Sequence, residues 1–328
     1  MDSLAGPDAR GGEAMSIKTL KSVLFLAFVL AWLLLPLTAE RHFVDVLNFA
    51  ALLAIGGLGV GMLLGQCGIV NLGQAAFYGI GAYATAYGTT TLEWHWLPSM
   101  VSGMLLSGGV AALIGYPVLR LSGFFLALAT LAIGSIASVL FFEWDWLTGG
   151  TLGVGGIPKL SLAGFELSDP KHFHYFIWPL VGMLLWLAGN LVNSRQGLAM
   201  RAMRDAAPAA EVLSVDMHRI KTVMFVLCAV LGALAGSLFA HYVSFVSVQS
   251  FTVERSILFL LVPVVAGARS VHGIVIGALF VALMPEALSS LGDMHQVLFG
   301  LALVLVVTLL PGGLTVLVSR SISRKEKA

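Results

Sequence analysis

The stretch SRQGLAMRAMRDAAPAAEVLSVDMHRIK, residues 194–221, carries eight charged residues and lies between two long apolar runs. The whole chain of 328 residues is 58% hydrophobic and only 11% charged. Soluble domains carry about 25% charged residues, so a water-soluble domain is excluded. We therefore expect residues 194–221 to lie outside a bilayer, as a polar connection between membrane-spanning helices.

About 20 apolar residues are needed to cross a bilayer as a helix. The segments that approach this length are residues 20–38, 43–66, 72–91, 97–119, 124–146, 175–193, 222–246, 253–270, 273–292 and 296–318. The sequence thus predicts an all-α polytopic membrane protein with about ten transmembrane helices. The first segment, preceded by Lys18 and Lys21, is predicted to be a signal anchor because no good cleavage site follows it.

The distribution of basic residues predicts the orientation of these helices. Lys and Arg accumulate on the cytoplasmic side of membrane proteins. With a cytoplasmic N-terminus, 14 of the 18 basic residues lie inside, and four lie outside: Arg41, Lys159, Lys171 and Arg255. Both termini and residues 194–221 are therefore expected in the cytoplasm. An even number of spans separates 194–221 from the C-terminal tail.

This topology gives a simple division of the chain. We expect residues 1–17 to form a disordered extension, residues 18–318 the transmembrane domain and residues 319–328 a basic cytoplasmic tail. Small residues recur every four positions within several spans, as helix packing in membranes requires. These stripes are Gly57, Gly61 and Gly65; Thr130, Gly134 and Ser138; and Cys228, Gly232, Gly236 and Ala240.

The sequence lacks the residues of an energy source or a catalytic centre. It contains no phosphate-binding G-x-x-x-x-G-K-[ST] motif and no His, Cys, Asp or Glu cluster with metal-ligand spacing. Only Glu286 lies clearly within a predicted span. It could be the proton site of a self-sufficient carrier, but an inter-helix hydrogen bond or a helix-end cap beside Pro285 is the simpler interpretation. We expect no enzymatic activity and no cofactor in this chain.

Within residues 194–221, the pattern predicts a short helix. Asp205 is a candidate N-cap, Pro208 suits a first helical turn, and Asp216 is a candidate N-cap for the following span. A short helix with small side chains and flanking arginines suits docking into a groove of a partner protein. The alternative is a solvated loop whose arginines only set the topology.

Three motifs in chain order carry a resemblance to a known family. RAMRDAAPAAEVLSVDMHRIK (201–221) resembles the coupling loop of binding-protein-dependent ABC permeases of the branched-chain amino acid type, with Ser214 where Gly is usual. GIVNLGQAAFYGIGAYATA (68–86) is similar to a Gly-rich run of that family, with Ile69 and Asn71 in place of Gln and Ser. LTGGTLGVGGIP (147–158) resembles an outer loop of the larger permease subunit, the LivM-like type. The similarity extends over about residues 45–315.

The resemblance implies a permease subunit of an ABC importer in a bacterial inner membrane, with branched-chain or other hydrophobic amino acids as cargo. The implied partners are a second homologous permease subunit, two ATP-binding subunits and a periplasmic substrate-binding protein, with ATP bound by the partners and no nucleic acid involved. Residues 194–221 would be the cytoplasmic coupling loop. The implied ATPase-coupling residues are Arg204, Asp205, Ala209, Ala210, Glu211, Leu213 and Ser214.

Two further groups of residues are candidates for contact with solute or binding protein. Glycines within 68–86 loosen the helix, and interrupted helices are where transporter sites form. The predicted pathway residues are Asn71, Gly73, Gln74, Phe77, Tyr78 and Gly79. In the outer loop 147–173, the predicted docking residues for the binding protein are Thr148, Gly149 and Gly150. Alternatives left open are urea, amides or aromatic acids as cargo, and an ion-coupled carrier that uses Glu286.

Overall fold

The computed structural model describes Trp32 and residues 35–162, 164–212, 216–289, 294–310 and 312–315. The helices in these ranges are α2 (Arg41–Met62), the π-helical turn η1 (Leu63–Cys67), α3 (Gln74–Thr90), α4 (Trp96–Val118), α5 (Gly123–Glu143), α6 (Asp145–Thr148), α7 (Pro170–Asn193), α8 (Arg195–Asp205), α9 (Ala207–Val212), α10 (Met217–Val243), the 3-10 turn η2 (Val248–Phe251), α11 (Val253–Ala266), α12 (Ile274–Leu288) and α13 (His295–Leu309). Four strands of two residues pair as antiparallel ribbons: β1 (Val154–Gly155) with β4 (Phe245–Val246), and β2 (Ser161–Leu162) with β3 (Phe165–Glu166).

Two helices form the centre of the bundle. These are α2 with its continuation η1 (Arg41–Cys67) and α10 (Met217–Val243). In their most apolar stretches, 94% and 78% of the residues are buried, whereas only 22% to 28% are buried in those of α4, α5 and α7. Helix α10 packs against α2, α3 and α4, and α2 also packs against α7, α11 and α12. The outer faces of α4, α5 and α7 carry exposed Leu, Phe and Trp side chains, as expected for helices in contact with lipid.

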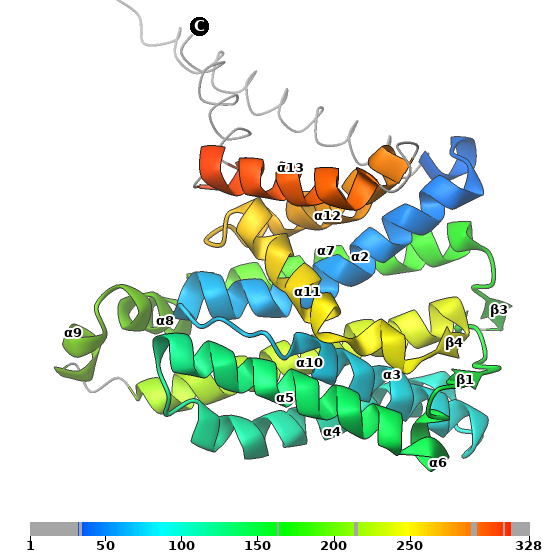
Figure 1. The fold of residues 1–328 in the computed structure, drawn as a ribbon, viewed down its shortest axis with the longest axis horizontal. Helices are drawn as coiled ribbons and strands as arrows, with labels where there is room; N and C mark the ends of the chain where they lie inside the picture. Colours follow the sequence, from blue (N-terminus) through cyan, green and yellow to red (C-terminus); the bar gives the residue numbers. More distant parts are fainter. Residues whose placement is uncertain are drawn as a thin grey trace, which may run out of the picture.

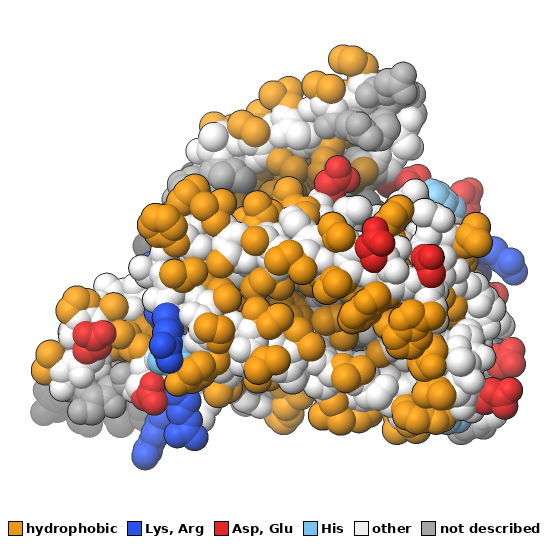
Figure 2. Space-filling model, turned by 60° about the horizontal axis from the view of Figure 1, so that its bottom comes forward, with side chains coloured by type: hydrophobic (Ala, Val, Ile, Leu, Met, Phe, Trp, Pro, Cys, Tyr) orange, Lys and Arg blue, Asp and Glu red, His pale blue; other side chains and the backbone are white. Residues whose placement is uncertain are grey.

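The long helices place the connecting segments at two ends of the molecule. Figure 1 shows α8 and α9 projecting at one end, whereas α6 and the short strands lie at the other. We call these the α8–α9 end and the strand end. On the face drawn in Figure 2, the apolar side chains form a broad surface between the ends, and Lys and Arg gather beside α8 and α9.

Polar side chains set where several helices begin. Asp169 caps α7 by accepting a hydrogen bond from the Lys171 N–H, with Pro170 in the first turn. Asp216 caps α10 by accepting from the Arg219 N–H, which confirms the predicted N-cap. The predicted small-residue stripes also lie at helix contacts, since Gly57 faces Val262 and Gly236 faces Tyr78.

Five described helices are long and apolar enough to cross a membrane: Arg41–Cys67, Trp96–Val118, Gly123–Glu143, Pro170–Asn193 and Met217–Val243. The predicted segments 72–91, 253–270 and 273–292 instead contain helices of 17, 14 and 15 residues. Helix α3 is short because residues 68–73 are not helical, and α11 ends at Gly267, whose φ of 97° an L-residue rarely adopts. Most of the predicted span 20–38 lies outside the described residues.

Candidate functional site

The predicted coupling region consists of two helices rather than one short helix in a loop. Helix α8 is capped by Ser194, whose hydroxyl accepts from the Gly197 N–H, and it continues to Asp205. Helix α9 follows after a break at Ala206. The prediction that Asp205 caps the short helix is wrong. Its carboxylate instead accepts two hydrogen bonds from the preceding Arg204, at 2.9 and 3.0 Å.

Helix α9 presents one side to α8 and the other to the surroundings. Ala210 is buried, whereas Glu211 is exposed and Val212 is 85% exposed at the end of the helix. Ala209 lies within α9, and Leu213 and Ser214 lie outside the described residues. A small buried residue and an exposed apolar one on a short projecting helix fit a surface that docks into a partner.

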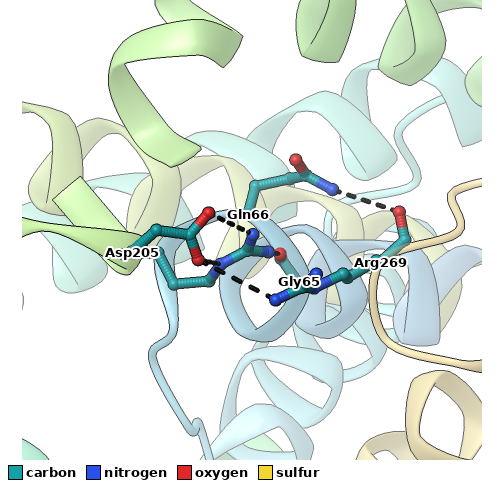
Figure 3. Close-up of polar contacts among 5 residues, drawn as sticks. Gly65, Gln66, Asp205 and Arg269 are labelled. Carbon is teal, nitrogen blue, oxygen red and sulfur yellow. Dashed lines mark hydrogen bonds and ion pairs between the residues drawn. The ribbon is translucent and has the colours of Figure 1, made fainter. Parts of the chain in front are cut away.

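Arg204 does not point away from the molecule. Its side chain is only 15% exposed, and its guanidinium donates a hydrogen bond to the carbonyl of Gly65 in η1 as well as to Asp205 (Figure 3). Gly68, with φ of 71°, ends η1 and turns the chain away. Carbonyls in the last turn of a helix lack helical partners, and an arginine is a favourable donor there. Arg204 thus caps the interrupted end of α2.

A second contact completes what we call the junction, formed by Gly65, Gln66, Arg204, Asp205 and Arg269. The guanidinium of Arg269 lies 3.9 Å from Asp205, and the Gln66 amide donates to the Arg269 carbonyl at 3.5 Å (Figure 3). The hydrogen bond from Arg204, with the charges of Arg204 and Arg269, lowers the pKa of the Asp205 carboxyl. The junction joins α8, η1 and the connection between α11 and α12.

Sequence reasoning missed Gly65, Gln66 and Arg269 as members of this site. Gly65 was assigned only to helix packing, and there a Cβ atom would lie 1.7 Å from the carbonyl oxygen of Ala268. A signal was present in Arg269, a charged residue in a very short connection between two apolar segments. Its pairing with a residue as distant in the chain as Asp205 had no signal in the sequence pattern.

Of the stretch 68–86, in which glycines were predicted to loosen the helix, only residues 68–73 are non-helical, with Ile69 and Asn71 buried; α3 continues without a break through Gly79 and Gly81. Backbone groups in such a segment need partners inside the protein, because lipid offers none. The Leu72 N–H donates to the Thr130 hydroxyl at 3.1 Å, and the Ala75 N–H donates to the Ser256 hydroxyl at 2.8 Å. Helices α5 and α11 therefore hold the start of α3 in place.

The amide side chains of this segment are fully buried. Asn71 donates to the Gln74 carbonyl oxygen at 3.1 Å and accepts from the Gly73 N–H at 3.0 Å. Gln74 donates to the backbone carbonyl of Cys228 in α10 at 3.0 Å. In this conformation both amides bond to protein atoms. A role in the pathway stays a prediction, which requires that these bonds open as the segment moves.

The other predicted pathway residues separate between two cavities. Phe77 lines a cavity of about 570 Å³ between α3, α4 and α5. Tyr78 lines one of about 350 Å³ between α2, α11 and α12. Gly79 lies in neither lining; a Cβ there would meet the rings of Phe141 and Phe251.

Replacing Ser256 with alanine is expected to lower the free energy of unfolding by about 1–3 kcal/mol, because the buried Ala75 N–H then lacks an acceptor. Thermal unfolding of the purified protein in detergent measures this. Ser135→Ala is the matched control, since the exposed Ser135 hydroxyl bonds only to its own helix at Leu131. Equal unfolding temperatures for the two variants would contradict the role assigned to Ser256.

At the strand end, the predicted docking residues hold the loop in shape from within and form little of its exposed surface. Thr148 is buried, and its hydroxyl donates to the Phe141 carbonyl at 2.6 Å. Gly149 adopts a φ of 67°, and Gly150 is buried. The large apolar side chains exposed on the loop are Leu152 (84%) and Phe165 (80%). Sequence reasoning missed both, although each is an isolated large residue beside glycine.

Glu286 forms an inter-helix hydrogen bond, which confirms the simpler interpretation of this residue. Its carboxylate lies 2.6 Å from the imidazole of His42, and both side chains are partly exposed on the surface of the protein. His42 lies at the start of α2 and Glu286 near the end of α12. The carboxylate therefore lies near the strand end and is not enclosed within the bundle.

Comparison with known proteins gives consistent matches. The family described as branched-chain amino acid transport system, permease component, matches residues 42–307. The chain is 31% identical to the high-affinity branched-chain amino acid transport system permease protein LivM of Escherichia coli, over 92% of this chain and 76% of LivM. It is 26% identical to LivH of Salmonella typhimurium, over 80% of this chain and 90% of LivH. No solved structure matches significantly.

Proposed function

This chain belongs to the permease component family of branched-chain amino acid transport systems, and we propose that it forms half of the translocation pathway of an ABC importer. LivM and LivH are both named as permease proteins of one kind of transport system, so a second permease subunit related to LivH is the proposed partner. The proposed cargo is a branched-chain or other hydrophobic amino acid. Two ATPase subunits and a periplasmic binding protein complete the proposed complex.

In the proposed orientation, the α8–α9 end faces the cytoplasm of a bacterial inner membrane and the strand end faces the periplasm. The proposal counts ten spans: the one predicted from the sequence at residues 20–38, and nine described helices, the short α3, α11, α12 and α13 included. The basic residues support this orientation. Those in or beside α8, α9 and the helix ends next to them are Arg120, Arg195, Arg201, Arg204, Arg219, Lys221 and Arg269; Arg41, Lys159 and Lys171 lie at the start of α2 and in the segments before α7 and at its start, and Arg255 lies in the first turn of α11.

The junction is the observation that carries this proposal. A passive loop that only sets topology needs no buried hydrogen bond to a transmembrane helix. Arg204, however, links α8 directly to η1, which leads into the interrupted segment 68–73. A displacement of α9 by an ATPase subunit would thus move a segment that lies inside the bundle. In this proposal, ATP-driven closure of the ATPase pair moves α8 and α9, and 63–73 changes conformation with them.

The surface that we propose for docking of the binding protein lies at the strand end. Leu152 and Phe165 project as apolar tips. Acidic residues Glu143, Asp145 and Glu166 are nearby in the chain and exposed. Pairing of β1 with β4 ties this loop to the end of α10, the helix that α8 and α9 precede in the chain. We propose that the docking contacts come from Leu152 and Phe165, with Thr148, Gly149 and Gly150 shaping the loop.

Uptake in proteoliposomes tests the proposal. Vesicles containing this chain, its partner permease and both ATPases should accumulate leucine or valine only with internal ATP and an external loaded binding protein. A self-sufficient carrier predicts the opposite result: gradient-driven uptake by this chain alone, lost in Glu286→Gln. The exposed Glu286–His42 pair does not favour that alternative.

A further inference from the structure

The cavity between α2, α11 and α12 combines an apolar wall with one cationic side chain. Its volume is about 350 Å³, within the range of small-molecule sites. The lining residues are Val46, Phe49, Leu52, Leu53, Tyr78, Arg255, Leu258, Phe259, Val281, Ala282 and Pro285. All are apolar or aromatic except Arg255.

Arg255 has no acidic partner among the residues that the structure describes. Its backbone N–H donates to the Thr252 carbonyl, and no side-chain hydrogen bond of Arg255 is found among the described residues. No described ion pair includes its guanidinium, and the acid that follows Pro285 in the chain, Glu286, is paired with His42. A guanidinium carries five N–H donors and stays charged, so a half-buried one beside apolar walls favours an anionic partner.

Aromatic side chains line this cavity beside Arg255. Tyr78 and Phe259 stack edge to face with ring centroids 5.2 Å apart, and the Tyr78 hydroxyl forms no hydrogen bond with any described residue. Phe49 is partly exposed beside them. The cavity therefore offers a charged donor on one helix and a phenol hydroxyl on another, with hydrophobic surface between them.

The larger cavity, between α3, α4 and α5, does not offer this combination. None of its lining residues is charged, and the polar groups in its wall are hydroxyls, such as those of Tyr83 and Ser102, and the indole N–H groups of Trp94 and Trp144. A carboxylate transferred there would lose its hydration without gaining a cationic partner, which is strongly unfavourable. Of these two cavities, only the one with Arg255 suits a solute that carries both an anionic group and an apolar side chain.

We propose that Arg255 binds the carboxylate of the transported solute while Phe49, Tyr78 and Phe259 contact its apolar side chain. This rests on the proposed function and selects among its possible cargoes. A carboxylate accepts two charge-assisted hydrogen bonds from a guanidinium, whereas the oxygen of urea or of a neutral amide forms weaker ones. The site thus favours amino acids or aromatic acids over urea and amides.

Variants of Arg255 test the site in the assembled complex. Arg255→Gln is expected to reduce ATP-dependent valine uptake at low concentration by about tenfold or more, with Arg255→Lys intermediate. Arg41→Gln is the matched control, because Arg41 is an exposed arginine in the first turn of α2, 3.8 Å from Asp169, and does not line the cavity. Equal uptake by Arg255→Gln and Arg41→Gln would overturn the proposal while leaving the importer function intact. That result also fits an arginine that binds lipid phosphate only.

Thiol labelling tests the site without changing Arg255, and so does not depend on folding of that variant. Ala282→Cys places a thiol in the cavity wall, and the native Cys67 and Cys228 are buried. In the complex without binding protein, millimolar valine is expected to slow maleimide labelling of this thiol, whereas valinamide is not. Leu152→Cys, in the outer loop, should be labelled at the same rate with valine and with valinamide. Equal protection by valine and valinamide, or none by either, would contradict carboxylate binding here.

Discussion

Replacing Arg204 with alanine is expected to reduce ATP-dependent uptake by about tenfold or more while the complex still assembles. The substitution removes the donor to the buried Gly65 carbonyl and the partner of Asp205. An unsatisfied carbonyl in such a place costs about 1–3 kcal/mol, enough to change the equilibrium between two conformations of the interrupted helix about tenfold. Uptake and ATP hydrolysis are measured on the same proteoliposomes.

The two measurements distinguish coupling from simple damage. If Arg204 transmits movement, ATP hydrolysis continues in Arg204→Ala but no longer rises when loaded binding protein is added. Arg195→Ala is the control, because Arg195 is an exposed arginine in the first turn of the same helix. Uptake close to wild type in Arg204→Ala would contradict the role of the junction. So would an equal loss in Arg195→Ala.

Replacing Gly65 with alanine is expected to have the second large effect. The added methyl group would lie 1.7 Å from the carbonyl oxygen of Ala268 and 2.7 Å from its carbonyl carbon, so η1 and the connection between α11 and α12 must separate. Overpacking costs about 1–3 kcal/mol, and contact with backbone rather than a flexible side chain favours the upper end. We expect a lower unfolding temperature and a severalfold loss of uptake.

Gly109→Ala is the matched control for this steric effect. Gly109 is an exposed helical glycine in α4, where a Cβ atom would meet nothing within 4 Å. Alanine has the higher helix propensity, so this variant should match or slightly exceed the wild type in stability. An unfolding temperature for Gly65→Ala that equals that of Gly109→Ala would show that η1 does not pack as closely as the structure indicates.

The parts of this fold that sequence reasoning predicted are those with local chemical signals. Long apolar runs located α2, α4, α5, α7 and α10, and Asp216 marked where α10 begins. Periodicity could not show which side of each helix faces inward, because lipid and core are both apolar. Small residues carried that information instead, as in Gly57 against Val262.

The predictions about the candidate site failed where neighbouring residues compete for one polar side chain. Asp205 has the residue type and position of an N-cap, but Arg204 next to it offers a charged donor and takes its carboxylate. The junction itself joins residues 65, 204 and 269, which no local pattern relates. Asn71 and Gln74 were predicted as pathway residues, which stays a prediction, and the hydrogen bonds they make to each other and to α10 depend on tertiary packing.

Cross-linking at Val212 tests most directly whether α9 is driven by an ATPase subunit. Val212 is 85% exposed, and both native cysteines are buried, so Val212→Cys provides an accessible thiol at the tip of α9. We predict that a cysteine in the ATPase groove captures it in a disulfide, that uptake stops when the bond forms, and that reduction restores it. Normal ATP-dependent uptake by complexes in which no disulfide or bifunctional reagent ever joins Val212→Cys to an ATPase subunit would contradict the account.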